Sequence, residues 1–166
     1  MPTPEAPQAV LTHVDATGAA RMVDVSGKSV STREAIATGV LRTTVEVTDL
    51  LRRNGLPKGD ALATARIAGI MAAKRTPDLV PLCHPIAISG VTVDLEVDET
   101  EVRIAARVRT ADRTGVEMEA LTAVAVAGLT LHDMVKAVDP AAVLDAVRVE
   151  RKEGGKTGTW TRPADR

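Results

Sequence analysis

The chain contains no phenylalanine and no tyrosine, and Trp160 is its only tryptophan. Its 21 lysine and arginine residues are balanced by 22 aspartate and glutamate residues, so the formal net charge is −1. Proteins that bind nucleic acids use aromatic side chains for base stacking and a positive surface for the phosphates. Since both features are scarce here, we expect no nucleic-acid partner.

Cysteine is equally scarce, because Cys83 is the only one. A single cysteine excludes an intrachain disulfide and suits a reducing cytosol. The first residues, MPTPEAPQAV, hold proline and glutamate where a signal peptide has a basic and then an apolar region, and no apolar run approaches a membrane span. We therefore expect a soluble, cytoplasmic protein without a membrane partner.

The apolar content of 45% comes mainly from valine, alanine, leucine and isoleucine. The length predicts one domain over 11–158, after a disordered lead-in over 1–10 and before a C-terminal tail over 159–166. Two nearly all-apolar helices give this small subunit more apolar surface than a single small layer of the fold can bury. We therefore expect a homo-oligomer with a large interface.

Hydrophobic periodicity predicts six main elements. Apolar and polar residues alternate in the strands, whereas the helices have apolar middles, and Asp60 is placed to cap the first of them. The expected order is strand 40–47, helix 60–75, strands 91–97 and 102–108, helix 115–138 and strand 146–151. This order predicts an α+β, ferredoxin-like split βαβ fold, in which two long helices cover one face of an antiparallel sheet.

Shorter signals predict the connections. The run from Leu11 to Ser26 is typical of a hairpin or extended arm that turns at Thr17 and Gly18. The pattern STRE at 31–34 is a capping box, which favours a short helix closed by Gly39. A brief helix is expected over 48–54. Three prolines then predict an extended segment from Asp78 to His84, with His84 at its end.

Reactive side chains gather at the ends of the two long helices. Asp133 and Lys136 are three positions apart, so they share a helical face and can form an ion pair. That pair alone is one interpretation. The other is a general acid or base held beside the lysine that tunes it. The remaining candidates at these ends are Lys58, His84, Glu117 and Glu119, and Lys156 in GGKTG is a further one.

The distance along the second helix limits how these groups can meet. Glu119 and Asp133 are 14 positions apart, or roughly 21 Å at the rise of an α-helix. Either one group is structural, or the ligand is long, or the site is shared between subunits, which is the geometry we favour. Glu117 and Glu119 have a simpler explanation too, because carboxylates in a first turn complement the helix dipole.

The glycine-rich segment GGKTG, at 154–158, lacks the spacing of a nucleotide P-loop. It could still close on a phosphate through its backbone N–H groups and Lys156, or it could be an ordinary solvated turn. No histidine and cysteine spacing suggests a metal site, since His13 and His132 are far from His84 in the chain. The residues therefore favour a phosphate-bearing small molecule handled by acid–base chemistry.

Four segments together closely resemble the cyclic pyranopterin monophosphate synthase family of molybdenum cofactor biosynthesis. They are VDVSGK, KGDALATARIAGIMAAKRTPDLVPLCHP, TGVEMEALTAVAVAGLTLHDMVKAV and GGKTG. The resemblance implies a hexamer built as a trimer of dimers, with a site near the dimer interface. It implies a phosphorus–oxygen lyase, which rearranges a cyclised dihydro-GTP, (8S)-3',8-cyclo-7,8-dihydroguanosine 5'-triphosphate, to cyclic pyranopterin monophosphate and diphosphate.

By the matching motifs, the resemblance places the acid–base aspartate at Asp133, its partner at Lys136 and a further catalytic lysine at Lys58. The substrate contacts that it implies are Leu82, Cys83, His84, Glu117, Met118, Glu119, Lys156, Asp24, Lys28 and Arg33. Arg113 stands where the family favours a lysine or another polar residue. No cofactor is required by the sequence, and Mg²⁺ could accompany the triphosphate.

A competing hypothesis is a non-catalytic, ferredoxin-like module that binds a nucleotide or an amino acid and regulates a partner. It would need an anion site, but neither Asp133 nor the lysines around it. Another enzyme acting on a different nucleotide, as a phosphate-ester lyase or cyclase, is a further alternative.

Overall fold

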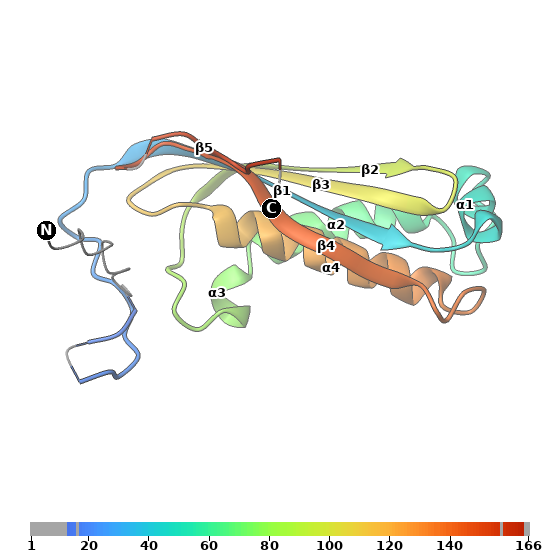
Figure 1. The fold of residues 1–166 in the computed structure, drawn as a ribbon, viewed down its shortest axis with the longest axis horizontal. Helices are drawn as coiled ribbons and strands as arrows, with labels where there is room; N and C mark the ends of the chain where they lie inside the picture. Colours follow the sequence, from blue (N-terminus) through green and yellow to red (C-terminus); the bar gives the residue numbers. More distant parts are fainter. Residues whose placement is uncertain (1–12, 16, 157, 165–166) are drawn as a thin grey trace, which may run out of the picture.

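Five strands form one antiparallel sheet within the part of the chain that the computed structural model describes, residues 13–15, 17–156 and 158–164 (Figure 1). The strand order is β2-β3-β1-β4-β5. In chain order, the elements are β1 (Ser31–Arg42), α1 (Val45–Arg52), α2 (Ala61–Ala73), α3 (Thr76–Leu79), β2 (Ile88–Val97), β3 (Glu101–Asp112), α4 (Glu117–Val135), β4 (Val143–Glu153) and β5 (Trp160–Thr161).

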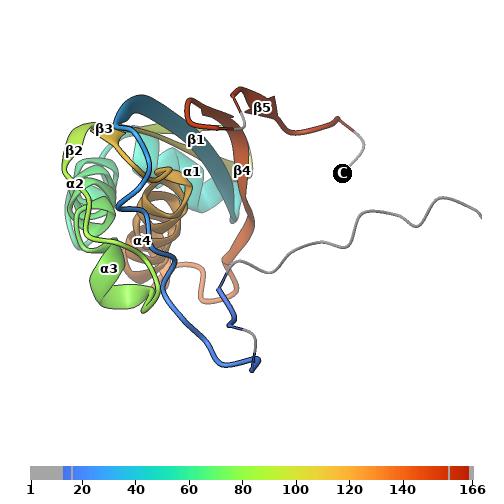
Figure 2. The same cartoon turned by 90° about the vertical axis from the view of Figure 1, so that its left-hand side faces the viewer.

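Helices α2 and α4 lie together on one face of this sheet, as the end-on view shows (Figure 2). Helix α4 packs on β1, β3 and β4, whereas α2 packs on β2 and on α4. The chain order β1-α2-β2-β3-α4-β4, with β1 and β3 in the centre of the sheet, is that of ferredoxin-like folds. The predicted α+β class and the placement of both long helices on one face are therefore confirmed.

The two long helices approach each other through small side chains. Ala65, Ala123 and Ala127 are fully buried, and Gly69 lies between the helices. A Cβ atom added at Gly69 would lie 2.8 Å from the carbonyl oxygen of Ala123 and 3.3 Å from the Cβ of Ala127. The core therefore gains its density from close backbone approach rather than from large side chains.

Replacing Gly69 by alanine should lower the free energy of unfolding by about 1–3 kcal/mol, the usual cost of overpacking. Alanine is the better helix former by about 1 kcal/mol. The clash should still dominate, because a backbone oxygen cannot move without moving α4. Urea unfolding measures the difference, and Thr64→Ala on the exposed side of α2 is the control, expected within about 0.5 kcal/mol of the wild type. A Gly69→Ala protein as stable as the wild type would contradict close helix packing.

The helix predicted from Ser31 to Gly39 is wrong, because β1 already begins at Ser31 and continues to Arg42. Ala35, Ala37 and Leu41 alternate into the core, and β1 pairs with β3 on one side and β4 on the other. Glu34 does not complete a capping box. Instead, it accepts hydrogen bonds from Arg107 and Arg109 on β3. Pairing with two distant strands outweighs the local capping pattern.

The same strand ends sooner than predicted, since Thr44 caps α1 and the helix begins at Val45. The predicted extended segment is also wrong at its start. Helix α3 covers Thr76–Leu79, because Pro77 occupies its first turn, where a missing N–H costs nothing. Asp60 does cap α2, its side chain accepting a hydrogen bond from Ala63 N.

Helix α2 exposes part of its apolar surface in the single subunit, where Ile67 and Met71 are 59% and 54% exposed. This agrees with the expectation that the subunit has more apolar surface than it buries. The expectation that no apolar run approaches a membrane span is wrong for α4, which is long and apolar enough by length and composition alone. Half of that window is buried in the fold, as in the core helix of a soluble domain.

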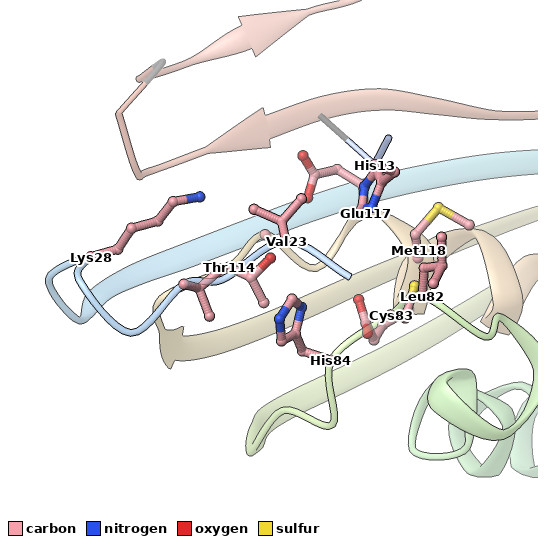
Figure 3. A pocket seen from close by; sticks show the side chains of 12 residues that line it. His13, Val23, Lys28, Leu82, Cys83, His84, Thr114, Glu117 and Met118 are labelled. Atoms are coloured by element: carbon pink, nitrogen blue, oxygen red, sulfur yellow. The ribbon is translucent and has the colours of Figure 1, made fainter. Parts of the chain in front are cut away.

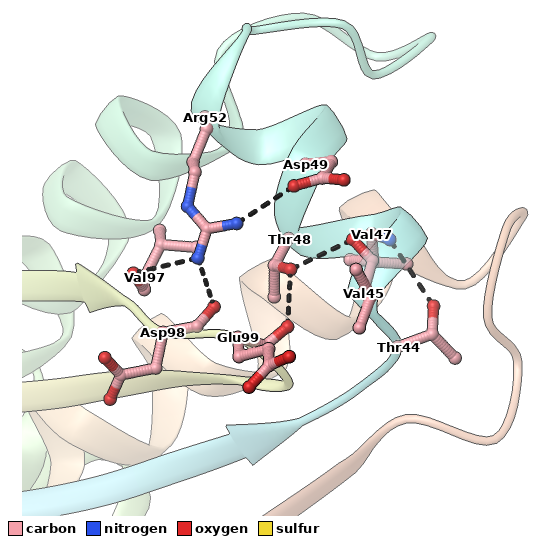
Figure 4. A network of polar contacts seen from close by, with 9 residues as sticks. All are labelled: Thr44, Val45, Val47, Thr48, Asp49, Arg52, Val97, Asp98 and Glu99. Carbon is pink, nitrogen blue, oxygen red and sulfur yellow. Dashed lines mark hydrogen bonds and ion pairs between the residues drawn. The ribbon is translucent and has the colours of Figure 1, made fainter.

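Helix α1 is fastened to the turn between β2 and β3 (Figure 4). The guanidinium of Arg52 donates to the carbonyl oxygens of Asp98 at 2.6 Å and Val97 at 3.4 Å. The hydroxyl of Thr48, which is fully buried, donates to the carbonyl oxygen of Glu99 at 2.8 Å. These bonds fix the end of α1, from which the chain turns into the loop that leads to α2.

The segment before β1, residues 13–30 apart from 16, is called the N-terminal arm below. Its predicted turn is confirmed, because Val14 and Ala20 form an antiparallel bridge and Gly18 has a φ of +85°. The lead-in predicted over 1–10 lies outside the described residues. Within the predicted C-terminal tail, β5 pairs with β4 through Trp160 and Lys152.

Candidate functional site

A carboxylate held between two lysines lies at the C-terminal end of α4. Lys58 Nζ donates to Asp133 Oδ2 at 2.7 Å, and Lys136 Nζ lies 2.7 Å from Asp133 Oδ1. Lys58 Nζ also donates to the main-chain carbonyl of Asp133 at 2.9 Å, satisfying an acceptor in the last helical turn. The predicted pair of Asp133 and Lys136 therefore gains a third member from the loop before α2.

The two lysines keep the Asp133 carboxyl ionised. Hydrogen bonds from Lys136 and then Lys58 lower the pKa of the Asp133 carboxyl to about 2. The carboxyl is therefore fully ionised at neutral pH. All three side chains are about half exposed, so they are open to a ligand.

A cavity of about 370 Å³ lies at the opposite end of α4 (Figure 3). It is bounded by the N-terminal arm, the loop after α3 and the first turn of α4. We call it the arm cavity. The structure brings seven predicted substrate contacts together on its wall, namely Lys28, Leu82, Cys83, His84, Glu117, Met118 and Glu119. The cavity is also lined by His13, Val23, Val25, Thr114 and Gly115.

Sequence reasoning missed the contribution of His13, Val23 and Val25, because nothing in the arm's own pattern indicates where it folds back. Gly115 carried a readable signal, since it directly precedes the VEME segment. A Cβ atom there would meet the carboxylate of Glu117, whose Oε2 would be only 1.9 Å away. The glycine thus leaves room for a carboxylate that bends back along the chain.

The two glutamates of this cavity are in different electrostatic environments. Glu117 lies 3.0 Å from Lys152 Nζ on β4. Glu119 is 3% exposed, and burial, followed by repulsion from Glu117, raises the pKa of its carboxyl to about 7. Burial and the nearby Glu119 also raise the pKa of the Cys83 thiol. Glu119 can therefore donate or accept a proton near neutral pH, and Cys83 stays a neutral thiol.

Basic side chains continue from the arm cavity toward the glycine-rich segment. Lys28, Arg33, Lys152 and Lys156 line a second cavity of about 280 Å³, which shares Lys28, Gly115 and Glu117 with the first. We call this second space the basic cavity. Three acids, Glu34, Glu117 and Glu153, also line it. Glu34 and Glu153 are paired with arginines outside the lining, and Glu117 is paired with Lys152. Positive charge therefore prevails in the cavity, which suits a ligand with several negative charges.

Asp24 is the one predicted substrate contact that lines neither cavity. Its carboxylate accepts a hydrogen bond from Ser26 N at 2.8 Å. That bond, with a smaller effect from the nearby His84, lowers the pKa of Asp24. Asp24 therefore shapes the turn of the arm beside the arm cavity.

The structure separates the predicted residues into two groups. Lys58, Asp133 and Lys136 lie at one end of α4, and the substrate contacts lie at the other, roughly 21 Å away along the helix axis. A small molecule cannot touch both groups in one subunit. Among the described residues, no three His, Cys, Asp or Glu side chains lie close enough together to hold a metal ion.

Comparisons with known proteins agree on one family. The model described as the MoaC family matches residues 22–155. A protein of Streptomyces coelicolor named cyclic pyranopterin monophosphate synthase is 67% identical, over 94% of this chain and 92% of its own length. In Mycobacterium tuberculosis H37Rv, cyclic pyranopterin monophosphate synthase 2 is 62% identical over 92% of this chain and 91% of its own. A Corynebacterium efficiens protein, also named cyclic pyranopterin monophosphate synthase, is 56% identical over 91% of this chain and 97% of its own length. The chain therefore belongs to the MoaC family.

Proposed function

We propose that this chain is a cyclic pyranopterin monophosphate synthase of molybdenum cofactor biosynthesis. It would convert (8S)-3',8-cyclo-7,8-dihydroguanosine 5'-triphosphate to cyclic pyranopterin monophosphate and diphosphate, as a phosphorus–oxygen lyase. The observation that carries the proposal is Asp133 bonded to both Lys58 and Lys136. A module that only binds a nucleotide needs no such triad, and relatives that share this name match nearly the whole chain.

The phosphate chemistry is a transfer at the α-phosphorus. A sugar-derived hydroxyl oxygen attacks this atom, and the new P–O bond closes the cyclic phosphodiester. The bond from the α-phosphorus to the bridging oxygen breaks, and diphosphate leaves with its electron pair. The proton of the hydroxyl passes to the acid–base group. Lysines nearby stabilise the charge that develops on the phosphates.

Asp133 is proposed as the acid–base group, with Lys58 and Lys136 as its catalytic partners. In the free subunit its pKa of about 2 makes it a weak base. Substrate phosphates compete for the two ammonium groups, which withdraws their hydrogen bonds from the carboxylate. Its pKa then rises toward the ordinary range, and it accepts protons more readily.

The substrate contacts are proposed to hold the two ends of the ligand. Lys28, Arg33 and Lys156 would bind the phosphates in the basic cavity. The apolar walls and carboxyls of the arm cavity, with Leu82, Cys83, His84, Glu117, Met118 and Glu119, would hold the ring system, and Asp24 would order the arm. No resident cofactor is proposed, and Mg²⁺ would enter bound to the triphosphate.

We further propose a homohexamer, a trimer of dimers, in which the triad of one subunit faces the cavities of another. The separation along α4 supports this arrangement, because one subunit cannot complete the site. Exposed apolar side chains on the helical layer support it too, including Ile67, Met71, Leu79 and Leu129, all more than half exposed. The enzyme would work in the cytoplasm, where the Cys83 thiol stays reduced.

Phosphorus NMR of the purified protein with the cyclised dihydro-GTP tests the proposal. Signals of diphosphate and of a cyclic phosphodiester should appear as the triphosphate signals decline. Unchanged triphosphate signals, with the ligand nevertheless bound, would instead favour the binding module.

A further inference from the structure

Arg33 is held at the rim of the basic cavity by two features outside its own strand. Its Nε donates to the main-chain carbonyl oxygen of Asp112, at 2.9 Å. On its other side lie Gly154 and Gly155, which begin the glycine-rich segment after β4. Both glycines have positive φ angles, +88° and +72°.

The two glycines contact different parts of β1. A Cβ atom at Gly154 would lie 2.2 Å from the carbonyl oxygen of Thr32, so this position presses against backbone. A Cβ atom at Gly155 would lie 2.1 Å from Nη1 of Arg33 and 3.0 Å from its Cζ. Gly155 therefore occupies the space directly beside the guanidinium.

We propose that Gly155 is a positioning residue for Arg33. Its missing side chain leaves a slot in which the guanidinium lies, bonded to Asp112 and turned toward the basic cavity. The slot fixes where the guanidinium can meet a phosphate group, and so sets the affinity for diphosphate. This inference rests on the proposed function only in naming diphosphate as the ligand.

The competing explanation is that Gly155 is glycine only because its φ is positive. Gly158 separates the two explanations, since it belongs to the same segment and has a φ of +65°, yet a Cβ atom there would meet nothing within 4 Å. Alanine at either position has the same backbone strain. Only at position 155 would the alanine methyl group also displace the Arg33 guanidinium. The flexible arginine side chain should move to relieve this clash, and the backbone around it should keep its conformation.

The affinity test is a double-mutant cycle, with inorganic diphosphate as the probe in calorimetry. Gly155→Ala and Arg33→Ala should each weaken binding about 10- to 100-fold, the worth of charge-assisted hydrogen bonds. The double variant should bind no worse than Arg33→Ala, because the displaced group is already gone. Gly158→Ala should bind like the wild type. Losses that multiply in the double variant would overturn the proposal.

Crystal structures of Gly155→Ala and Gly158→Ala test the slot itself, whatever the protein catalyses. The Arg33 guanidinium should leave the Asp112 carbonyl in the first variant and keep it in the second. A guanidinium that stays in place in Gly155→Ala would overturn the proposal. Failure of the wild type to convert the cyclised dihydro-GTP would count against the proposed function instead, and would leave the crystallographic result standing.

Discussion

Replacing Asp133 by asparagine should slow diphosphate release from the cyclised dihydro-GTP by about 10²–10⁴-fold, the usual contribution of a positioned acid–base group. Asparagine keeps the shape of the side chain but neither carries the charge nor accepts the proton. Lys58 and Lys136, both 2.7 Å from the carboxylate, would lose the anion that orients them. Phosphorus NMR measures the rate of diphosphate release under saturating substrate.

Asp49→Asn is the matched control for this variant. Asp49 is equally exposed and also pairs with a cation three positions along a helix, Arg52 at 3.0 Å, but it lies on α1. Its replacement should leave the rate unchanged. Equal rates for wild type and Asp133→Asn would remove the acid–base role.

Mixed oligomers extend the test to the shared site. Asp133→Asn subunits refolded together with Arg33→Ala subunits, assayed at a substrate concentration well below saturation, should be more active than either variant alone, because some interfaces then pair an intact triad with an intact basic cavity. Mixtures no more active than the better of their components would contradict a site built from two subunits.

Replacing Glu119 by glutamine should stabilise the fold by about 3 kcal/mol at pH 8 and by little at pH 4. The pKa of Glu119 is about 7 in the folded chain, against an ordinary value of 4.5. Well below pH 4.5 the carboxyl is protonated in both the folded and the unfolded chain, so its burial carries no charge and does not lower the free energy of unfolding. As the pH rises to 7, the unfolded chain releases the proton and the folded chain keeps it, so the wild type loses stability. Glutamine removes this dependence.

Urea unfolding at intervals from pH 4 to pH 8 measures the difference between the two proteins. Glu46→Gln is the control, because Glu46 is an exposed carboxylate in the first turn of α1 and its difference from the wild type should stay flat. A flat difference for Glu119→Gln as well would show that Glu119 ionises like a surface carboxylate. Glu119 would then be ionised at neutral pH and could not donate a proton there.

The element order could be predicted from the sequence because each long element has its own periodicity. The alternation in β2 and β3 and the apolar middle of α4 need no information from the rest of the chain. The segment from Ser31 to Gly39 could not be assigned in this way. Its capping pattern is local, whereas the pairing that makes it a strand comes from β3 and β4, far away in the sequence.

The candidate site likewise has features that the sequence predicts and features that depend on tertiary packing. Spacing alone indicates the pair of Asp133 and Lys136, and the motifs group the contacts that line the arm cavity. The partnership of Lys58 with Asp133 depends on how the loop before α2 meets the end of α4. Likewise, the raised pKa of Glu119 depends on burial, and the slot beside Arg33 on the path of the glycine-rich segment. These are properties of packing, to which no periodicity corresponds.

The small strand β5 gives the protein an intrinsic optical reporter. Trp160 is the only indole in a chain without tyrosine, and it is 38% exposed, with the Arg162 guanidinium 5.8 Å from its ring centroid. It lies two residues after the glycine-rich segment and pairs with Lys152, which lines the basic cavity. All near-ultraviolet fluorescence of a subunit therefore originates beside the place where the phosphates are proposed to bind. Ligand binding at that place can be followed by emission alone, without a label.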